Sequence, residues 1–147
     1  MKYPILIIAV LVLIVVFAFK APSVDFTKDE VGGVQFHQGT FDEALKLAKK
    51  ENKLIFLDIY ATWCGPCKRL KSNTFSSAEV GSLYNQKFIN VALDGEKGEG
   101  LELAQKYGVR GYPTLLFLDY KGNIVTRTGG YHNVSEFIEL GKTVAKK

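Results

Sequence analysis

Two cysteines, Cys64 and Cys67, are the only thiols of this 147-residue chain, and two residues separate them. Two cysteines cannot build a disulfide framework, and they supply only half of the ligands of a four-coordinate zinc site. They can, however, form one small disulfide ring that opens and closes reversibly. The pair therefore predicts thiol–disulfide exchange, in which a thiolate attacks a disulfide sulfur.

The residues around the pair give the two cysteines different roles. The apolar run 54–60 predicts a buried strand before the motif, while Gly65 allows a tight chain reversal and Pro66 suits the first turn of a helix. Cys64 then lies at a helix N-terminus, where unpaired N–H groups and the helix dipole lower a cysteine pKa from about 8.5 toward about 7 or below. We expect Cys64 to be the nucleophile and Cys67, one turn later, to resolve the mixed disulfide.

Other uses of two cysteines at this spacing fit the sequence less well. Haem attachment requires a histidine directly after the second cysteine, where this chain has Lys68. His37 and His132 lie too far along the chain for the spacing of a zinc finger, and we expect both at the surface or in loops. The sequence thus predicts neither a metal nor a cofactor.

The remaining pattern predicts an α/β fold with a central mixed sheet flanked by helices. Two capping boxes, Thr40 with Glu43 and Ser76 with Glu79, indicate helix starts. The predicted helices are 41–51, a segment opened by the cysteine motif, 77–86, 101–107, and one from Asn133 or Ser135 to about Lys146. The predicted strands are 54–60 and 88–93, which run parallel, and 115–119 and 124–127, which form an antiparallel hairpin; 94–100 is expected to be a flexible loop.

Ile5–Phe19 is an uninterrupted apolar run near the N-terminus, drawn only from Ile, Leu, Val, Ala and Phe. Its length is at the short end of what crosses a bilayer core of roughly 30 Å. A helix in a soluble core would carry polar residues at helical spacing, and this run has none. We therefore predict an N-terminal hydrophobic helix within residues 1–20, favour an uncleaved membrane anchor, and keep a signal peptide cleaved after Ala18 as the alternative.

The domain division follows from this run. Residues 21–34, with one proline and two glycines among charged residues, predict a linker, and residues 35–147 predict the folded domain. Basic residues on the two flanks of the run nearly balance, so they leave its orientation open. A signal sequence exports the domain whether or not it is cleaved. We expect a domain outside the cytoplasm, membrane-anchored or secreted, and periplasmic in a Gram-negative bacterium.

The net charge of +4 indicates no particular partner. The composition, 47% hydrophobic and 23% charged, is that of a globular domain. No run of Lys and Arg alternates with aromatic residues, as a nucleic-acid-binding surface would require. The sequence therefore favours neither disorder nor a nucleic-acid partner.

Two distant motifs make residues 36–147 resemble a thioredoxin-fold domain. The first motif is Trp63–Cys67 (WCGPC), preceded by Asp58, and the second is Lys106–Thr114 (KYGVRGYPT). The stretch 41–58 is similar to anchored or exported thioredoxin-like proteins of bacteria and to the C-terminal thioredoxin-like domain of the membrane thiol:disulfide interchange protein DsbD. The resemblance implies the thioredoxin fold and a thiol:disulfide oxidoreductase activity.

The resemblance also implies roles for further residues. Pro113 would be a cis-proline beside the cysteine pair, and the backbone of Tyr112 would offer strand-like hydrogen bonds to an extended substrate. Asp58 would be buried near the resolving cysteine, with a raised pKa, and would help that thiol lose its proton. Trp63 would shield the site. The candidate catalytic residues are thus Cys64, Cys67 and Asp58, the candidate substrate-binding residues are Trp63, Tyr112 and Pro113, and Gly65 and Pro66 form the active-site loop.

One position departs from the pattern of the family. The lysine that usually faces the aspartate would align near Asn90, so the resemblance leaves Asp58 without a charged partner. The absence of that partner should raise the pKa of Asp58 further.

We expect a reductase of protein disulfides, because the Gly-Pro dipeptide between the cysteines resembles that of the reducing members of the family. A disulfide oxidase or isomerase is the alternative within the same chemistry. A non-catalytic module that holds the cysteines of cytochrome or copper sites for an assembly machine is the alternative outside it. The expected partners are substrate proteins with disulfides, a membrane electron donor similar to DsbD or CcdA, and the membrane itself, and we expect a monomer.

Overall fold

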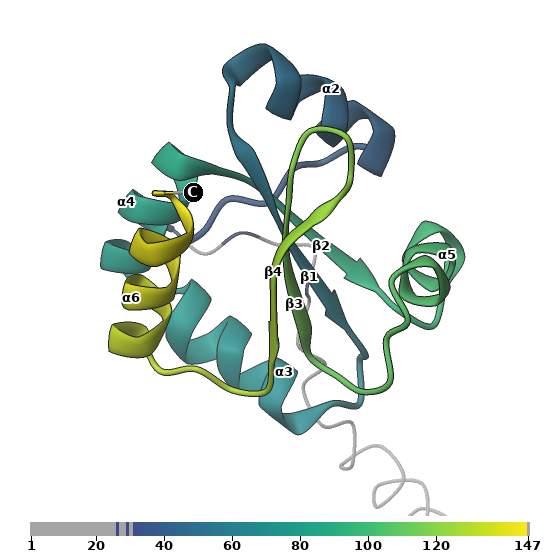
Figure 1. Ribbon diagram of the computed structural model, residues 1–147. Coiled ribbons are helices and arrows are strands. Elements are labelled where there is room, and N and C mark those ends of the chain that lie inside the picture. The colour runs from purple at the N-terminus through teal and green to yellow at the C-terminus, as the bar shows by residue number, and fades with distance from the viewer. Residues whose placement is uncertain (1–25, 27–28, 30, 147) are drawn as a thin grey trace, which may run out of the picture.

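The computed structural model describes residues 26, 29 and 31–146. In this part of the chain, a four-stranded mixed sheet of order β2-β1-β3-β4 lies between two layers of helices (Figure 1). The strands are β1 Leu54–Tyr60, β2 Phe88–Asp94, β3 Thr114–Leu118 and β4 Ile124–Gly129. The helices are α2 Phe41–Glu51, α3 Gly65–Arg69, the π-helical segment η1 Leu70–Phe75, α4 Ala78–Lys87, α5 Gly98–Lys106 and α6 Val134–Val144. The expected α/β fold is confirmed, whereas the expected N-terminal hydrophobic helix lies outside the described residues.

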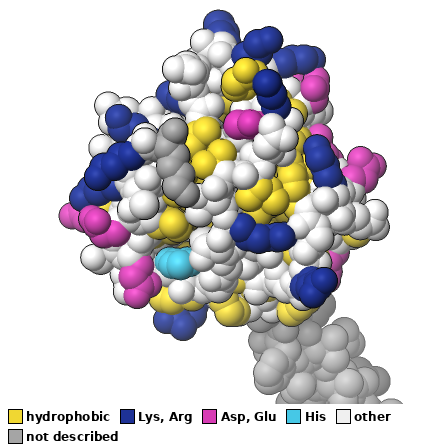
Figure 2. All heavy atoms as spheres, in the orientation of Figure 1, with side chains coloured by type: hydrophobic (Ala, Val, Ile, Leu, Met, Phe, Trp, Pro, Cys, Tyr) yellow, Lys and Arg dark blue, Asp and Glu magenta, His cyan; other side chains and the backbone are white. Residues whose placement is uncertain are grey.

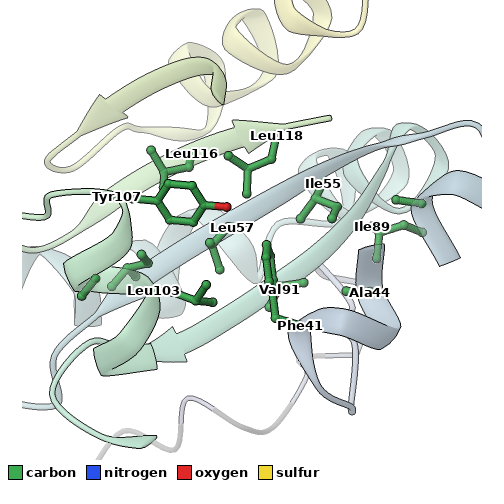
Figure 3. Close-up of a cluster of buried hydrophobic side chains, with 13 residues drawn as sticks. Phe41, Ala44, Ile55, Leu57, Ile89, Val91, Leu103, Tyr107, Leu116 and Leu118 are labelled. Carbon is green, nitrogen blue, oxygen red and sulfur yellow. The ribbon is translucent and has the colours of Figure 1, made fainter. Parts of the chain in front are cut away.

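Strand β1 runs parallel to β2, as predicted. It is central because its other neighbour, the antiparallel β3, lies on its opposite side, a pairing that the sequence pattern did not specify. Because helices cover both faces of the sheet, its side chains are buried in both directions, which explains its nearly unbroken apolar sequence. Ile55 and Leu57 point toward α2 and α5, where they pack with Phe41 and Leu103 (Figure 3). Phe56 points to the opposite layer, formed by η1, α4 and α6. Asp58 follows at the same alternation, so its carboxyl faces that second layer.

Two of the three predicted helix starts have the predicted N-cap residue. Thr40 caps α2 in a capping box with Glu43, and Asn133 caps α6 in a second one with Glu136. The capping box predicted at Ser76 is wrong. Ser76 still has helical backbone angles at the end of η1, so it cannot be an N-cap, and its hydroxyl donates to the Ser72 carbonyl oxygen over 2.6 Å instead. Ser77 caps α4, without a hydrogen bond from its side chain.

Two further elements differ from the predicted pattern. Helix α5 begins at Gly98, so residues 98–100 of the predicted flexible loop 94–100 are helical. The segment after the cysteine motif continues from α3 into the π-helical η1, which has no separate signal in the sequence. The hairpin β3–β4 forms as expected and carries a register shift between Phe117 and Leu118.

The described residues of the predicted linker lie against the domain. Val34 is buried in the cluster that includes Phe56 and Phe75, and its N–H donates to the Phe75 carbonyl oxygen. Phe26 is only 7% exposed and packs at the end of β1. The core of the protein therefore extends to residues that precede position 35.

The surface carries mixed charges. Lys and Arg side chains are scattered among acidic and neutral ones over the face in Figure 2. Among residues 26, 29 and 31–146, no helix is long and apolar enough to cross a membrane. The apolar run Ile5–Phe19 falls outside these residues.

Candidate active site

Cys64 and Cys67 form a disulfide at the start of α3. Cys64 is the N-cap residue, with an extended backbone (φ −72°, ψ 115°), and Pro66 lies in the first turn, as predicted. The S–S distance is 2.04 Å, and the two Cα atoms are 5.3 Å apart. The backbone N–H of Cys67 donates a hydrogen bond to Cys64 Sγ over 3.2 Å. A thiolate formed at Cys64 on reduction would accept the same bond at the positive end of the helix, which stabilises it.

The disulfide is buried in a small cluster of its own. Cys64 and Cys67 are each 1% exposed and pack with Tyr60, the last residue of β1, with Ala61, which follows it, and with Phe26. The rings of Phe26 and Tyr60 stack with their centroids 4.0 Å apart. A residue well before the cysteine motif thus helps to enclose the disulfide.

Asp58 is buried in the centre of the sheet, as the resemblance implied. It is 1% exposed, and its Oδ1 atom has no hydrogen-bond partner among the described residues. Burial raises the pKa of this carboxyl from the ordinary 3.8 to about 7, because the charged form loses its hydration. Asp58 lies two residues before Tyr60, on the face of β1 that packs against α3 and η1. An acid that titrates near neutral pH is therefore placed in the layer that holds Cys67.

The expectation that Asp58 lacks a charged partner is wrong. Asn90 is indeed neutral, and its amide donates to the Gln35 carbonyl oxygen and to Asn85 Oδ1 over 3.2 and 3.1 Å. The positive charge comes instead from Lys71 on η1, which is 4% exposed. Its ammonium lowers the pKa of Asp58 and opposes part of the effect of burial. The charged partner of Asp58 therefore lies on a helix that packs against the sheet, and not on the neighbouring strand where the family has its lysine.

Trp63 and Tyr112 lie together beside the disulfide. Trp63 is 66% exposed, and its ring lies edge-on to the Tyr112 ring, with centroids 6.0 Å apart. Its Nε1 donates to the Glu96 carboxylate over 3.1 Å. Tyr112 packs on the cysteine cluster. Its pKa is raised, first by burial and then by the charges of Glu96 and Asp94, so the phenol remains neutral.

The peptide bond between Tyr112 and Pro113 is cis, as the resemblance implied. It directly precedes β3, whose first residue, Thr114, pairs with Ile59 near the end of β1. The end of β1 and the start of β3 therefore lie at the same end of the sheet as the cysteine pair. The structure thus brings Tyr112 and Pro113 to the end of the sheet that carries Trp63 and Cys64.

Three residues of this site were not found from the sequence: Lys71, Glu96 and Phe26. Lys71 had a positional signal alone, because it follows Cys67 by four residues and so shares its side of the helix, but this spacing does not indicate burial. Glu96 and Phe26 had none, since their contacts depend on how a loop and the chain before the domain fold back.

The described residues contain no group of three or more His, Cys, Asp and Glu side chains suited to a metal ion. His132 lies in the loop before α6, with Nε2 3.2 Å from Thr128 Oγ1. His37 precedes α2, and its Nε2 is buried without a hydrogen-bond partner among the described residues. The two histidines are therefore loop residues, as expected.

The sheet order and a disulfide that caps a helix are the features of the thioredoxin-like class of protein-disulfide oxidoreductases. A family described as a thioredoxin-like domain matches residues 41–145. The chain belongs to this thioredoxin-like family.

Several known proteins are similar to this chain. DsbD, a thiol:disulfide interchange protein of Colwellia psychrerythraea, is 32% identical over 109 residues, which cover 71% of this chain and 18% of DsbD. A proposed disulphide-isomerase from Bacteroides thetaiotaomicron, solved in solution, is 44% identical with a TM-score of 0.68, covering 78% of this chain and 95% of that one. The oxidised C-terminal domain of Neisseria meningitidis DsbD is 27% identical with a TM-score of 0.57, covering 69% and 87% of the two chains. The chain thus spans less than a fifth of the DsbD relative but most of each solved domain.

Proposed function

We propose that this protein reduces disulfides in substrate proteins outside the cytoplasm, through the dithiol of Cys64 and Cys67. The observation that carries the proposal is the hydrogen bond from the Cys67 N–H to Cys64 Sγ at the start of α3. This bond favours a thiolate at Cys64, and the thiolate is the form that attacks a disulfide.

The reaction transfers two electrons from the dithiol to the substrate. The Cys64 thiolate attacks one sulfur of the substrate disulfide, which forms a mixed disulfide and releases the other sulfur as a thiolate. Cys67 then gives its proton to Asp58 and attacks Cys64 Sγ, so that the second substrate sulfur leaves. The protein ends with the Cys64–Cys67 disulfide seen in the structure, and an external dithiol must reduce it again.

Tyr112 and Pro113 are proposed to bind the substrate backbone beside the cysteines. No backbone hydrogen bond links Tyr112 to another residue in the described part of the chain, so its N–H and C=O are available to an extended peptide. The exposed ring of Trp63 would cover the substrate on one side. This arrangement favours substrates whose disulfide lies in an extended, accessible segment.

An insulin reduction assay tests the activity. We expect the full chain in detergent to accelerate the reduction of insulin by dithiothreitol, followed as precipitation of the released chain. Cys64→Ser should abolish the acceleration, because no nucleophile remains. Equal rates for the wild type and a folded Cys64→Ser variant would contradict the proposal, and binding of substrate that persists in the Cys64→Ser/Cys67→Ser double variant would point to a non-catalytic assembly module.

An isomerase or oxidase is the second candidate, favoured by the likeness to the Bacteroides thetaiotaomicron protein proposed as a disulphide-isomerase. The reduction potential of the pair separates the candidates. A reduction potential of about −270 mV is typical of a reductant, one of about −180 mV is typical of an isomerase, and one of about −120 mV is typical of an oxidant. Equilibration with glutathione or dithiothreitol redox buffers measures it, and we expect the lowest of these values.

The electron donor is proposed to be a membrane thiol:disulfide protein similar to DsbD or CcdA. The likeness to the C-terminal domain of Neisseria meningitidis DsbD supports this, since that domain is joined to a larger DsbD chain. A Cys67→Ser variant should trap the mixed disulfide between Cys64 and its partner, because the resolving thiol is missing. Mass spectrometry of the trapped species would identify both substrates and donor.

A further inference from the structure

Lys71 is a buried lysine that the reaction described above leaves without a role. Its side chain is 4% exposed, although lysine is almost never fully buried unless it is paired. An ammonium group taken out of water loses hydration that only a nearby negative charge or polar partners can offset. A lysine buried at this point of the fold therefore requires a physical reason.

The backbone directs Lys71 toward the site. Lys71 follows Cys67 by four residues, so the two side chains lie on the same side of the helical segment. The segment is π-helical from Leu70 to Phe75, and π-helical turns occur frequently at functional sites. Its buried residues are Leu70, Lys71, Thr74 and Phe75. The ammonium thus enters the layer between η1 and the sheet, where Nζ lies 5.7 Å from the centre of the Phe36 ring.

Asp58 faces the same layer from the sheet. Its register partners are Ala92 on β2 and Leu115 on β3, so neither neighbouring strand places a charge beside the carboxyl. Asn90, two residues before Ala92, is neutral as well. The positive charge that acts on the Asp58 carboxyl is the ammonium of Lys71.

The other titratable groups near this layer, among the described residues, are Cys67, Tyr84, Tyr60 and Arg69, and the cation among them, Arg69, is exposed. Cys67 is in the disulfide. Tyr84 on α4 donates to the Phe137 carbonyl oxygen over 2.9 Å, and burial raises its pKa. Tyr60 is a phenol stacked on Phe26. Arg69, on α3, is exposed and lies over the Tyr131 ring.

We propose that Lys71 is a positioning residue for proton transfer, whose ammonium favours the ionised form of the Asp58 carboxyl, the form that can accept the proton of Cys67. This inference rests on the proposed function in one respect, the role of Asp58 as the acceptor. The effect of Lys71 on the titration of Asp58 does not depend on that role.

The proton transfer belongs to the resolving step. The Cys67 thiol gives its proton to the Asp58 carboxylate, and the new thiolate attacks Cys64 Sγ. The bond between Cys64 and the substrate breaks, and its electron pair leaves with the substrate sulfur. With a pKa of about 7, about half of Asp58 is ionised at pH 7 and able to accept the proton. Without the charge of Lys71, the acid form would predominate there.

The test uses Lys71→Met and Lys71→Gln, which remove the charge, and Lys71→Arg, which keeps it. The pKa of Asp58 is measured in the full chain in detergent micelles from the carbon chemical shift of its carboxyl. The release of substrate thiol from a preformed mixed disulfide at Cys64 is measured against pH. We expect the neutral variants to raise the pKa by about one unit and to slow release at pH 7 about fivefold, with recovery at higher pH. Lys71→Arg should stay close to the wild type in both measurements.

Two controls separate the possible failures. Lys49→Met removes the same charge from an exposed position of α2, on the other side of the sheet, and should change neither measurement. Slow release in Asp58→Asn, together with an unmoved titration in both neutral Lys71 variants, would overturn the inference and leave the proposed function standing. Unchanged release in Asp58→Asn would overturn the role of Asp58 as acceptor, and with it the role of Lys71.

Discussion

The Asp58 carboxyl links the stability of the protein to pH. In the folded protein its pKa is raised from the ordinary 3.8 to about 7, so the fold favours the protonated acid. Between these two values the native state holds a proton that the unfolded chain has lost. The contribution of Asp58 to the free energy of unfolding is therefore present at low pH and is lost as the pH rises from about 4 toward 7. The shift corresponds to about 4 kcal/mol, a cost that the fold carries at neutral pH.

Asp58→Asn should remove this dependence, because an amide of nearly the same shape does not ionise. We expect the free energy of unfolding of the oxidised wild type to fall by about 4 kcal/mol more than that of Asp58→Asn between pH 4 and pH 8. Urea denaturation of residues 21–147 at several pH values measures both curves. Parallel curves would contradict a raised pKa at Asp58.

For individual residues, the sequence was sufficient to predict the reacting groups, but it was not sufficient to predict the charged groups that affect their pKa values. The spacing of Cys64 and Cys67 predicted the disulfide pair, and the resemblance to the family implied the burial of Asp58; the structure contains both features. The burial of Lys71 could not be predicted, because a lysine in a helix is normally solvated and only the packing of η1 against the sheet excludes water from it.

The helices of this protein start in two different ways. Thr40 accepts a hydrogen bond from the Glu43 N–H, and Glu43 in turn accepts one from the Thr40 N–H. Ser77 occupies the corresponding position of α4 but makes no such bond. The same kind of residue at the same helical position thus differs in whether it satisfies an N–H group of the first turn.

Thr40→Ala should lower the free energy of unfolding by about 1 kcal/mol, because an N–H of the first turn loses its acceptor. Ser77→Ala should change it by less than about 0.5 kcal/mol, since no side-chain bond is lost. Urea denaturation of the two variants beside the wild type gives the comparison. An equal loss in both would mean that the capping bond at Thr40 contributes little.

The elements that could be predicted are those with a local signal. The unbroken apolar run of β1 and the N-cap residues of α2 and α6 are visible in neighbouring residues of the sequence. The π-helical turn of η1 is not, because the residues that form it would equally form an α-helix. The false capping box at Ser76 follows from that turn, since η1 continues through the residue that would otherwise have started the next helix.

At the scale of the whole molecule, the chain before the domain takes part in the active site. Phe26 lies in the same buried cluster as both cysteines and stacks on Tyr60. A division into linker and domain at residue 35 therefore assigns to the linker a side chain that encloses the disulfide.

Phe26→Ala should make the active-site thiol more reactive toward small alkylating reagents, because it removes a ring from the cluster around Cys64. We expect a faster reaction of Cys64 with iodoacetamide, measured in a Cys67→Ser background so that a single thiol is followed. Val31→Ala, at a fully exposed position nearby, is the matched control and should leave the rate unchanged. The same rate in both variants would mean that Phe26 does not restrict access to Cys64.

The contact of Phe26 also determines how far the enzyme can reach. If residues 1–20 anchor the chain in a membrane, the domain is held by the few residues between position 20 and Phe26, which span at most about 20 Å when fully extended. A linker free up to residue 34 would span about 50 Å. While Phe26 stays in place, an anchored domain would meet only substrates that come close to the lipid surface, and release of the whole segment up to Val34 would make the tether more than twice as long.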